Sequence, residues 1–399
     1  MRFKEIEMEK KLLTFCEKHL DILTVGVITL LGLWIRYGLR DLTNSDVDFC
    51  LLPWYDEIRD GGGIKALGKQ VGNYNMLYQT LIALFTYLPI KPLYAYKLFS
   101  VLFDFCLAVT VGRVAYRWGG MQKRGGIFAY AAVVLSPPVV LNSSAWGQCD
   151  SIYVFFGLMA LIMLCREKFV PAFLFLGVSF SFKLQAVFLL PLFLFVYFWQ
   201  KRYSILYFLL IPVVMCVLNL TGVFMGRSFL DIFTIYFDQT NEYNAMVINY
   251  PSIWLFFQEN YRPDAYWYLR KPGILVTVAV LFLLMLVFIL KKIEWNPRNL
   301  VYIAFLLSYA CVLFLPVMHE RYGYLYEILA IVILIWKRET IMLLVPMYCL
   351  TAMTYANYLF GMDTPASGGM AVVNLIVYLG YLYLLLKEMT KGQGRVSCS

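Results

Sequence analysis

The sequence predicts an all-α fold: a polytopic integral membrane protein with about twelve transmembrane helices. Of the 399 residues, 61% are apolar, whereas soluble proteins average roughly 45–50%. Only 15% are charged, against about 25% in soluble proteins, and the mean hydropathy is +0.69. Twelve spans of roughly 20 residues would fill about 240 positions, and no polar stretch exceeds about 50 residues. The composition therefore excludes a soluble enzyme and a large soluble domain.

Thirteen apolar stretches, some of them short, are candidates for these spans. A helix needs about 20 residues to cross the hydrocarbon core of a membrane, so length separates the stronger candidates from the weaker ones. The stretches lie at about 21–38, 76–90, 92–114, 126–142, 151–165, 168–182, 186–200, 204–222, 273–290, 299–316, 322–336, 340–359 and 369–386.

Basic residues between the apolar stretches set the predicted orientation. The positive-inside rule places seven basic clusters in the cytoplasm, together with both termini. The net charge of +9 is therefore attributed to cytoplasmic loops, and no nucleic-acid partner is expected. The clusters lie in the arm 1–20 and at 113–124, 166–168, 201–202, 291–298, 337–338 and 387–395.

Clusters on one side of a membrane must be separated by an even number of crossings. Three apolar stretches lie between the N-terminal arm and the cluster at 113–124, so one of them must not cross. The run 76–90 has about 15 residues, too few to span comfortably, and is predicted to form a re-entrant or interfacial helix on the outer side. The segments that then open on the outer face are 39–91, 143–150, about 183–185, 223–272 and 317–321.

A single membrane domain, 1–399, follows from this scheme. Within its first outer loop, the segment 53–69 has the pattern of an amphipathic surface helix, with Pro53 suited to the first turn and Gly61–Gly63 as a break. The predicted parts are a cytoplasmic arm (1–20), a first outer loop with interfacial helices (39–91), core helices (92–222), a long outer loop (223–272) and C-terminal helices (273–399).

Some polar and reactive residues fall inside or beside the apolar stretches. Asp104 is the clearest charge within an apolar run, and it could pair structurally with Lys97 or with other neighbours. The nine cysteines include no CxxC pair and are expected mainly as small buried side chains. A disulfide between Cys50 and Cys149 is the alternative for these two residues.

Two carboxylates, Asp46 and Asp48, follow the first predicted span. A carboxylate at a membrane surface can act as a general base on an acceptor hydroxyl, or it can bind a metal ion. The alternative is a helix N-cap or a solvated turn. An Asp-x-Asp pair permits a divalent metal without requiring one, so metal binding stays open.

The second outer segment contains Trp146, Gln148 and Asp150, which supply an aromatic ring, an amide and a carboxylate within five residues. Sugar binding requires such a combination, because a ring face stacks on the sugar and polar groups bind its hydroxyls. The alternative is an interfacial tryptophan followed by Asp150 as a helix N-cap.

Further polar residues lie at the outer ends of other predicted spans. Lys183 either snorkels to the interface or meets an anion. Arg321 is planar and permanently charged, which suits a phosphate group, with interfacial snorkelling as the alternative. His319, beside Glu320, could bind phosphate or a metal, or cap a helix.

In these motifs the chain resembles the family C (GT-C) integral-membrane glycosyltransferases, and it is most similar to bacterial relatives of the second mannosyltransferase of GPI-anchor assembly. The resemblance covers most of the chain. Relatives often show a proline pair where this chain has Asn75, Met76 and Leu77. The segments that carry the resemblance are 45–55, 73–78, 146–151 and 318–322.

The resemblance implies a GT-C-like fold and a polyprenyl-phosphate-linked monosaccharide donor, with no obligatory metal and a divalent metal as an option. It also implies an inverting displacement in which an acidic first-loop residue is the base. By position this base is Asp46, and Asp48 would orient the acceptor or the donor sugar. The donor phosphate would meet Arg321, His319 and Lys183. The sugar or acceptor would meet Trp146, Gln148, Asp150, Glu320, Tyr74 and Asn75.

Together these features predict a hexosyl-type glycosyltransferase in the plasma (inner) membrane, with its active site on the outer face. Its expected partners are the lipid-linked donor, a lipid-linked or cell-envelope glycan acceptor, and membrane lipid. The competing hypothesis is a lipid-linked glycan flippase or transporter, which would show internal repeats, broken helices and midplane charges. A structural membrane scaffold would explain the composition but not the set of motifs.

Overall fold

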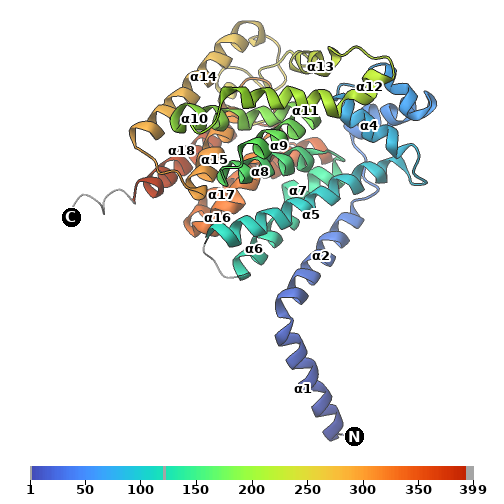
Figure 1. The fold of residues 1–399 in the computed structure, drawn as a ribbon, viewed down its shortest axis with the longest axis vertical. Helices are drawn as coiled ribbons and strands as arrows, with labels where there is room; N and C mark the ends of the chain where they lie inside the picture. Colours follow the sequence, from blue (N-terminus) through green and yellow to red (C-terminus); the bar gives the residue numbers. More distant parts are fainter. Residues whose placement is uncertain (1, 120–122, 392–399) are drawn as a thin grey trace, which may run out of the picture.

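A computed structural model describes residues 2–119 and 123–391 (Figure 1). Within these ranges the regular structure is helical except for two short strands, which confirms the all-α prediction. The α-helices are α1 (Arg2–Lys18), α2 (Leu20–Gly38), α3 (Leu52–Asp60), α4 (Met76–Phe85), α5 (Pro92–Gly119), α6 (Lys123–Val134), α7 (Pro137–Val140), α8 (Asp150–Cys165), α9 (Phe169–Phe182), α10 (Leu190–Gln200), α11 (Leu210–Leu218), α12 (Leu220–Phe224), α13 (Asp231–Thr240), α14 (Tyr266–Leu290), α15 (Pro297–Phe314), α16 (Tyr324–Trp336), α17 (Ile341–Phe360) and α18 (Gly368–Thr390).

Short 3₁₀ or π turns connect many of these helices. The two strands, β1 (Val247–Ile248) and β2 (Met318–His319), pair in parallel. The turns are η1 (Val47–Leu51), η2 (Gly63–Gly68), η3 (Leu141–Ala145), η4 (Leu184–Leu189), η5 (Ile205–Leu209), η6 (Ile253–Phe256), η7 (Glu320–Gly323) and η8 (Arg338–Thr340).

Six helices of the described chain are long and apolar enough to cross a membrane, or seven if one bent pair counts as a span. Other apolar stretches form helices of 10–17 residues, shorter than the roughly 20 residues that a span needs. The predicted twelve crossings are therefore not confirmed. The spans are Leu20–Gly38, Pro92–Trp118, Tyr266–Leu290, Pro297–Phe314, Arg338–Phe360 and Gly368–Thr390, and the bent pair is Lys123–Val134 with Pro137–Ala145.

The apolar run 76–90, predicted not to cross, forms the ten-residue helix α4. Ten residues rise only about 15 Å, half of the hydrocarbon thickness. Asn75 caps the helix, because its side chain accepts a hydrogen bond from the N–H of Met76 at 2.8 Å. Asn219 accepts from the next N–H, that of Leu77, at 2.7 Å. The start of α4 is thus tied to the α11–α12 junction.

The first loop also contains the predicted interrupted surface helix. Helix α3 has Pro53 in its first turn and buries Tyr55 and Ile58 on one face. It ends at Gly61, and the chain resumes as η2 after Gly62, which has a left-handed φ of +88°. The break therefore falls at the glycine run, as the sequence pattern indicates.

Burial is uneven among the long helices. In an apolar stretch of 18 residues, 83% of the residues are buried in α15 but only 11% in α2. Helices α1 and α2 extend away from the bundle (Figure 1), and α2 leaves Leu30 and Trp34 largely exposed. An apolar helix with such exposed side chains needs lipid around it, which agrees with a multi-pass membrane protein.

Asp104 pairs with Arg36, not with Lys97. The Arg36 guanidinium donates to one Asp104 carboxylate oxygen from Nε and Nη2 at 3.2 and 2.9 Å, and the Ser143 hydroxyl donates to the same oxygen at 2.6 Å. Lys97 instead donates to the carbonyls of Leu39, Arg40 and Leu42 beyond the end of α2. The ion pair joins the exposed helix α2 to the bundle.

Replacing Arg36 by Met should destabilise the protein by about 3–5 kcal/mol, because it leaves the Asp104 carboxylate buried without its counter-charge. Urea unfolding in a mild detergent would measure the change. The double variant Arg36→Met/Asp104→Leu should recover most of the loss, since it removes both charges. Equal stability of the single variant and wild type would contradict the structural role of this pair.

Candidate functional site

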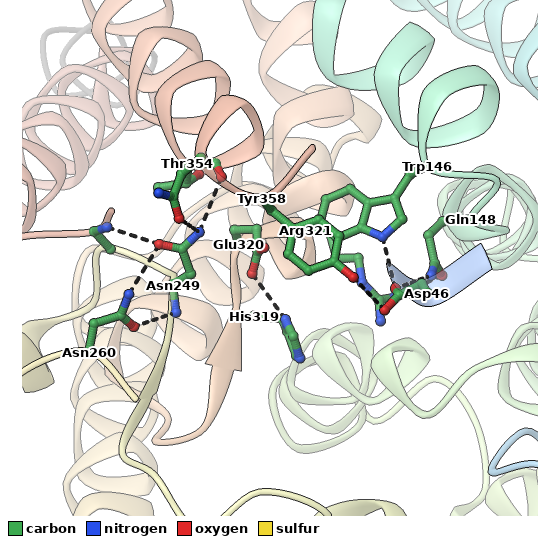
Figure 2. A network of polar contacts seen from close by, with 12 residues as sticks. Asp46, Trp146, Gln148, Asn249, Asn260, His319, Glu320, Arg321, Thr354 and Tyr358 are labelled. Carbon is green, nitrogen blue, oxygen red and sulfur yellow. Dashed lines mark hydrogen bonds and ion pairs between the residues drawn. The ribbon is translucent and has the colours of Figure 1, made fainter. Parts of the chain in front are cut away.

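Segments that are far apart in the sequence meet in one hydrogen-bonded cluster (Figure 2). Asp46 precedes the π turn η1, and Trp146 follows the π turn η3. Such turns are rare in proteins and occur frequently at functional sites. The other members are Tyr74 before α4, Gln148 and Asp150 at the start of α8, Lys183 between α9 and η4, Arg321 in η7 and Tyr358 near the end of α17.

Asp46 is held by three hydrogen bonds. One carboxylate oxygen accepts from Trp146 Nε1 and Gln148 Nε2, both at 2.8 Å, and the other accepts from the Tyr358 hydroxyl at 2.6 Å. The Trp146 and Tyr358 rings stack, with centroids 4.4 Å apart. A carboxylate has about four acceptor positions, so the oxygen facing Tyr358 keeps room for one more donor.

The pKa of Asp46 lies below the ordinary value of an aspartate. Burial raises this pKa, but the Arg321 charge and the hydrogen bonds from Tyr358 and Trp146 lower it more. Asp46 is therefore ionised at neutral pH. Its ionised form contributes stability above the pKa of an unfolded aspartate, and this contribution is lost as the pH falls through the lowered folded-state pKa.

Gln148 connects the carboxylate to the cations. Its amide oxygen accepts from the Tyr74 hydroxyl at 2.9 Å, from Arg321 Nη1 at 3.1 Å and from Lys183 Nζ at 3.3 Å. Its amide nitrogen donates to Asp46. Only this orientation of the amide satisfies both sides, because the opposite one would place the amide oxygen against a carboxylate and the N–H groups against cations.

Asp150 is the buried counter-ion of the same cations. It accepts from Lys183 Nζ at 2.5 Å and from the Asn142 side chain at 2.7 Å, and it lies 3.8 Å from Arg321 Nη1. The side chains of Lys183 and Asp150 are only 4% and 1% exposed. Their charges largely balance each other, so Asp150 fixes Lys183 in place, while Arg321 lies close enough to interact with both Asp150 and Asp46.

Arg321 and His319 face a small polar cavity of about 60 Å³. Arg321 Nε and His319 Nε2 are buried and have no hydrogen-bond partner among the described residues. Such atoms beside a cavity are suited to bind an anion or water. The lining consists of Asn73, Tyr74, Lys183, Gln185, Gln239, Glu242, Tyr243, His319, Arg321 and Tyr322.

Glu320 orients His319. Its carboxylate lies 3.0 Å from His319 Nδ1 and is buried. An ionised Glu320 accepts from Nδ1–H, which leaves Nε2 directed at the cavity. Val317, two residues before His319, has a left-handed φ of +64°, an unfavourable conformation for a β-branched residue. The backbone therefore holds strain beside the cavity, and the N–H of Val317 donates to the Met246 carbonyl at 2.8 Å.

The loop 223–272 holds this segment through β1 and through Asn249. Val247 pairs with Met318 and Ile248 with His319. The Asn249 side chain then accepts from the Ala366 N–H at 2.9 Å and from Asn260 at 3.2 Å, and donates to the Thr354 carbonyl at 3.1 Å (Figure 2). Helix α17, the start of α18 and the long loop are therefore fixed together around His319.

His319 and Glu320 form a separate pair beside the cluster, and two further predicted site residues, Asp48 and Asn75, lie outside both. Asp48 is exposed, and its side chain makes no hydrogen bond or ion pair with the described residues. Asn75 caps α4 and donates to Tyr236 and to the Ile232 carbonyl, so it serves the fold around the cavity. Asp48 lies within η1, whereas Asn75 is occupied as the N-cap of α4.

The structure also bears on the alternatives of a disulfide and of a metal site. Cys50 and Cys149 are both free thiols, so the alternative disulfide is absent. Within residues 2–119 and 123–391, no three His, Cys, Asp or Glu side chains gather as a metal site.

Tyr358 and Asn142 were not predicted from the sequence. Tyr358 donates to Asp46 and stacks on Trp146, and Asn142 donates to Asp150. A signal for Tyr358 existed, because it lies at the end of the run 340–359 that the orientation scheme assigns to the outer face. Asn142 lies just before the second outer segment, but nothing in its neighbours identifies its partner.

The sequence has a distant similarity to a known protein. No protein-family model matches the chain. Over 173 residues the chain is 25% identical to GPI mannosyltransferase 1 of Kluyveromyces lactis. The match covers 43% of this chain and 42% of that protein, so the chain spans less than half the length of this relative. The named relative differs from the second mannosyltransferase that the motifs resemble. In general terms, the similarity and the apolar helices support a mannosyltransferase-like membrane glycosyltransferase.

Proposed function

We propose that the chain is a membrane glycosyltransferase that moves a monosaccharide from a polyprenyl-phosphate-linked donor to an acceptor hydroxyl, with inversion. The observation that carries this proposal is the connected row of Asp46, Gln148 and Arg321. It places an ionised carboxylate and a guanidinium on opposite sides of a single amide. A displacement at a sugar carbon needs both groups, a base for the attacking hydroxyl and a cation for the departing phosphate.

Asp46 is the proposed base. The acceptor oxygen forms a bond to the anomeric carbon, the bond from that carbon to the phosphate oxygen breaks, and the hydroxyl proton moves to Asp46. The carboxylate needs only to be ionised and within hydrogen-bond reach. Its lowered pKa meets the first requirement, and the free acceptor position beside Tyr358 offers the second.

Arg321 and His319 are proposed to bind the departing polyprenyl phosphate. Both residues line the same cavity, and their buried Nε and Nε2 atoms have no partner among the described residues. Charge that develops on the leaving oxygen would be stabilised in a site with little water, where such electrostatic interactions are strong. Lys183 would contribute mainly by holding Gln148 and Asp150, because its ammonium is already bound to them.

An apolar cavity near the cluster would hold the isoprenoid chain of the donor. A cavity of about 630 Å³ lies between α2 and α5, and its lining includes Ser144, two residues before Trp146. Leu33, Trp34 and Leu98 line the same cavity and are largely exposed. This position at the lipid-facing side of the bundle would let a long lipid enter laterally.

The cluster lies at one end of two candidate spans. Trp146 follows the span Lys123–Ala145, and Tyr358 lies near the end of Arg338–Phe360. We assign this end to the outer face of the plasma membrane, since the basic residues gather at the opposite ends. The acceptor would be a lipid-linked or cell-envelope glycan.

A transfer assay tests the proposal. The purified chain in lipid nanodiscs would receive a radiolabelled polyprenyl-phosphate mannose and membrane lipid extract as acceptor, and the products would be separated after mild acid hydrolysis. New acid-stable glycosidic product is the expected result. In a parallel assay with sealed proteoliposomes, movement of the labelled lipid between leaflets without any new product would favour the flippase hypothesis and contradict ours.

Replacing Tyr358 by Phe should lower transfer by about 10- to 100-fold, the value of one hydrogen bond to a charged group. The hydroxyl lowers the pKa of Asp46, so its removal should raise that pKa and move the acid limb of the pH–rate profile to higher pH. A pH profile of kcat/KM would measure this shift. An unchanged acid limb would contradict the assignment of that limb to Asp46.

A further inference from the structure

An apolar groove lies at the opposite end of the same two spans. It has a volume of about 720 Å³ and is formed by residues of α6, α16, η8 and α17. Phe128 and Ile341 on its walls are 58% and 44% exposed. The lining consists of Arg124, Gly125, Phe128, Leu334, Ile335, Arg338 and Ile341.

Two arginines are the only charged residues in this lining. Arg124 and Arg338 are both exposed, and neither makes a hydrogen bond or an ion pair with any residue that the structure describes. The nearest acidic residue in the sequence, Glu339, is engaged by Lys337 at 3.2 Å. Two guanidinium groups with no partner among the described residues therefore line an apolar groove.

The spans that form the groove show at which of their ends it lies. Arg124 lies in the first turn of α6, and Arg338 begins the span Arg338–Phe360. The other ends of these spans carry Trp146 and Tyr358. The groove and the Asp46 cluster thus lie at opposite ends of these two candidate spans, about 30 Å apart for a 20-residue helix such as α17.

We propose that this groove binds an anionic phospholipid from the leaflet opposite the Asp46 cluster. The lipid phosphate lies between Arg124 and Arg338, and an acyl chain lies along Phe128, Leu334 and Ile341. Guanidinium groups bind phosphate oxygens in pairs, and basic pockets between membrane helices on one side recognise acidic headgroups. A zwitterionic lipid lacks the net charge that two unpaired arginines favour.

This proposal does not depend on the transferase activity. It requires only that the two spans cross a membrane. A second copy of the chain is a less suitable occupant, because a two-fold interface through this groove would bring two pairs of arginines together.

Native mass spectrometry of the full chain in detergent tests the proposal. Phosphatidylglycerol or phosphatidylcholine of equal chain length would be added at the same concentration, and the fraction of protein carrying lipid would be measured. Wild type should retain phosphatidylglycerol preferentially. The variant Arg124→Gln/Arg338→Gln should lose at least tenfold in apparent affinity for phosphatidylglycerol and show no change for phosphatidylcholine.

A matched control is Arg166→Gln/Lys168→Gln, which removes two exposed positive charges from the α8–α9 connection outside the groove. It should bind phosphatidylglycerol as wild type does. Inorganic phosphate at millimolar concentration should not displace the lipid, because it lacks the acyl chain. Thermal unfolding of all variants would show that they fold.

Four outcomes would overturn the proposal, three of them in the binding measurements. They are equal retention of both lipids by wild type, unchanged phosphatidylglycerol binding by the Arg124/Arg338 variant, and displacement of the lipid by inorganic phosphate alone. A fourth is disulfide crosslinking of two chains by Ile341→Cys at high yield in membranes, which would assign the groove to a second copy.

Discussion

Replacing Asp46 by Asn should lower sugar transfer by about 10²- to 10⁴-fold, the usual contribution of a general base. The amide has the shape of the carboxylate, and its oxygen can still accept from Trp146 and Gln148. It cannot take the proton of the acceptor hydroxyl. The folded protein should therefore remain while turnover is lost. Single-turnover transfer from a labelled polyprenyl-phosphate sugar would measure the loss.

Asp48→Asn is the matched control for this experiment. It makes the same chemical change two residues away, on a side chain that is exposed and outside the cluster. We expect its rate to be close to that of wild type, in contrast to the assisting role that the motif resemblance implies. Wild-type turnover by Asp46→Asn would contradict the proposed base, and a loss in Asp48→Asn equal to that in Asp46→Asn would show that the geometry misses part of the site.

Replacing Arg321 by Gln should lower kcat by about 10²- to 10³-fold, comparable to the loss of an electrostatic group that stabilises a transition state. The effect should fall mainly on kcat, because charge on the departing phosphate grows as the glycosidic bond breaks. Arg321→Lys should retain part of the rate, since it keeps the charge and loses the planar pair of donors. Steady-state kinetics with varied donor would separate kcat from KM.

The pH profile adds an independent measurement on the same variant. The Arg321 charge lowers the pKa of Asp46, so Arg321→Gln should raise that pKa and shift the acid limb to higher pH. Arg262→Gln, on an exposed residue of the long loop paired only with Glu259 at the surface, is the control and should leave both readouts unchanged. Full kcat in Arg321→Gln would exclude this residue from phosphate binding.

Much of the cluster could be predicted from the sequence, because consecutive membrane helices return the chain to the same side. Asp46, Trp146, Gln148, Asp150, Lys183 and Arg321 all lie where helices end, and the structure brings them into contact. Their roles stay predictions. The sequence could not show which of these side chains are hydrogen-bonded to one another. The central position of Gln148 depends on side-chain directions that only the folded chain defines.

The less successful predictions share a physical cause. An apolar run gives a length but does not show where a helix breaks, so the run 168–200 contains α9, an extended Lys183 with φ −149°, η4 and α10 instead of two regular spans. In the same way, Asp104 has a basic neighbour in sequence at Lys97, but its partner Arg36 comes from another helix. Long-range contacts of this kind leave no local pattern.

The pairing of Val247–Ile248 with Met318–His319 has a consequence for engineering. Residues of the long loop are coupled through β1 and Asn249 to His319, which lines the small polar cavity. A chimera that exchanges the loop alone would disturb the pairing of β1 with β2 and displace the His319 side chain. Transplants between homologous proteins should therefore move residues 245–250 and 316–321 as one cassette.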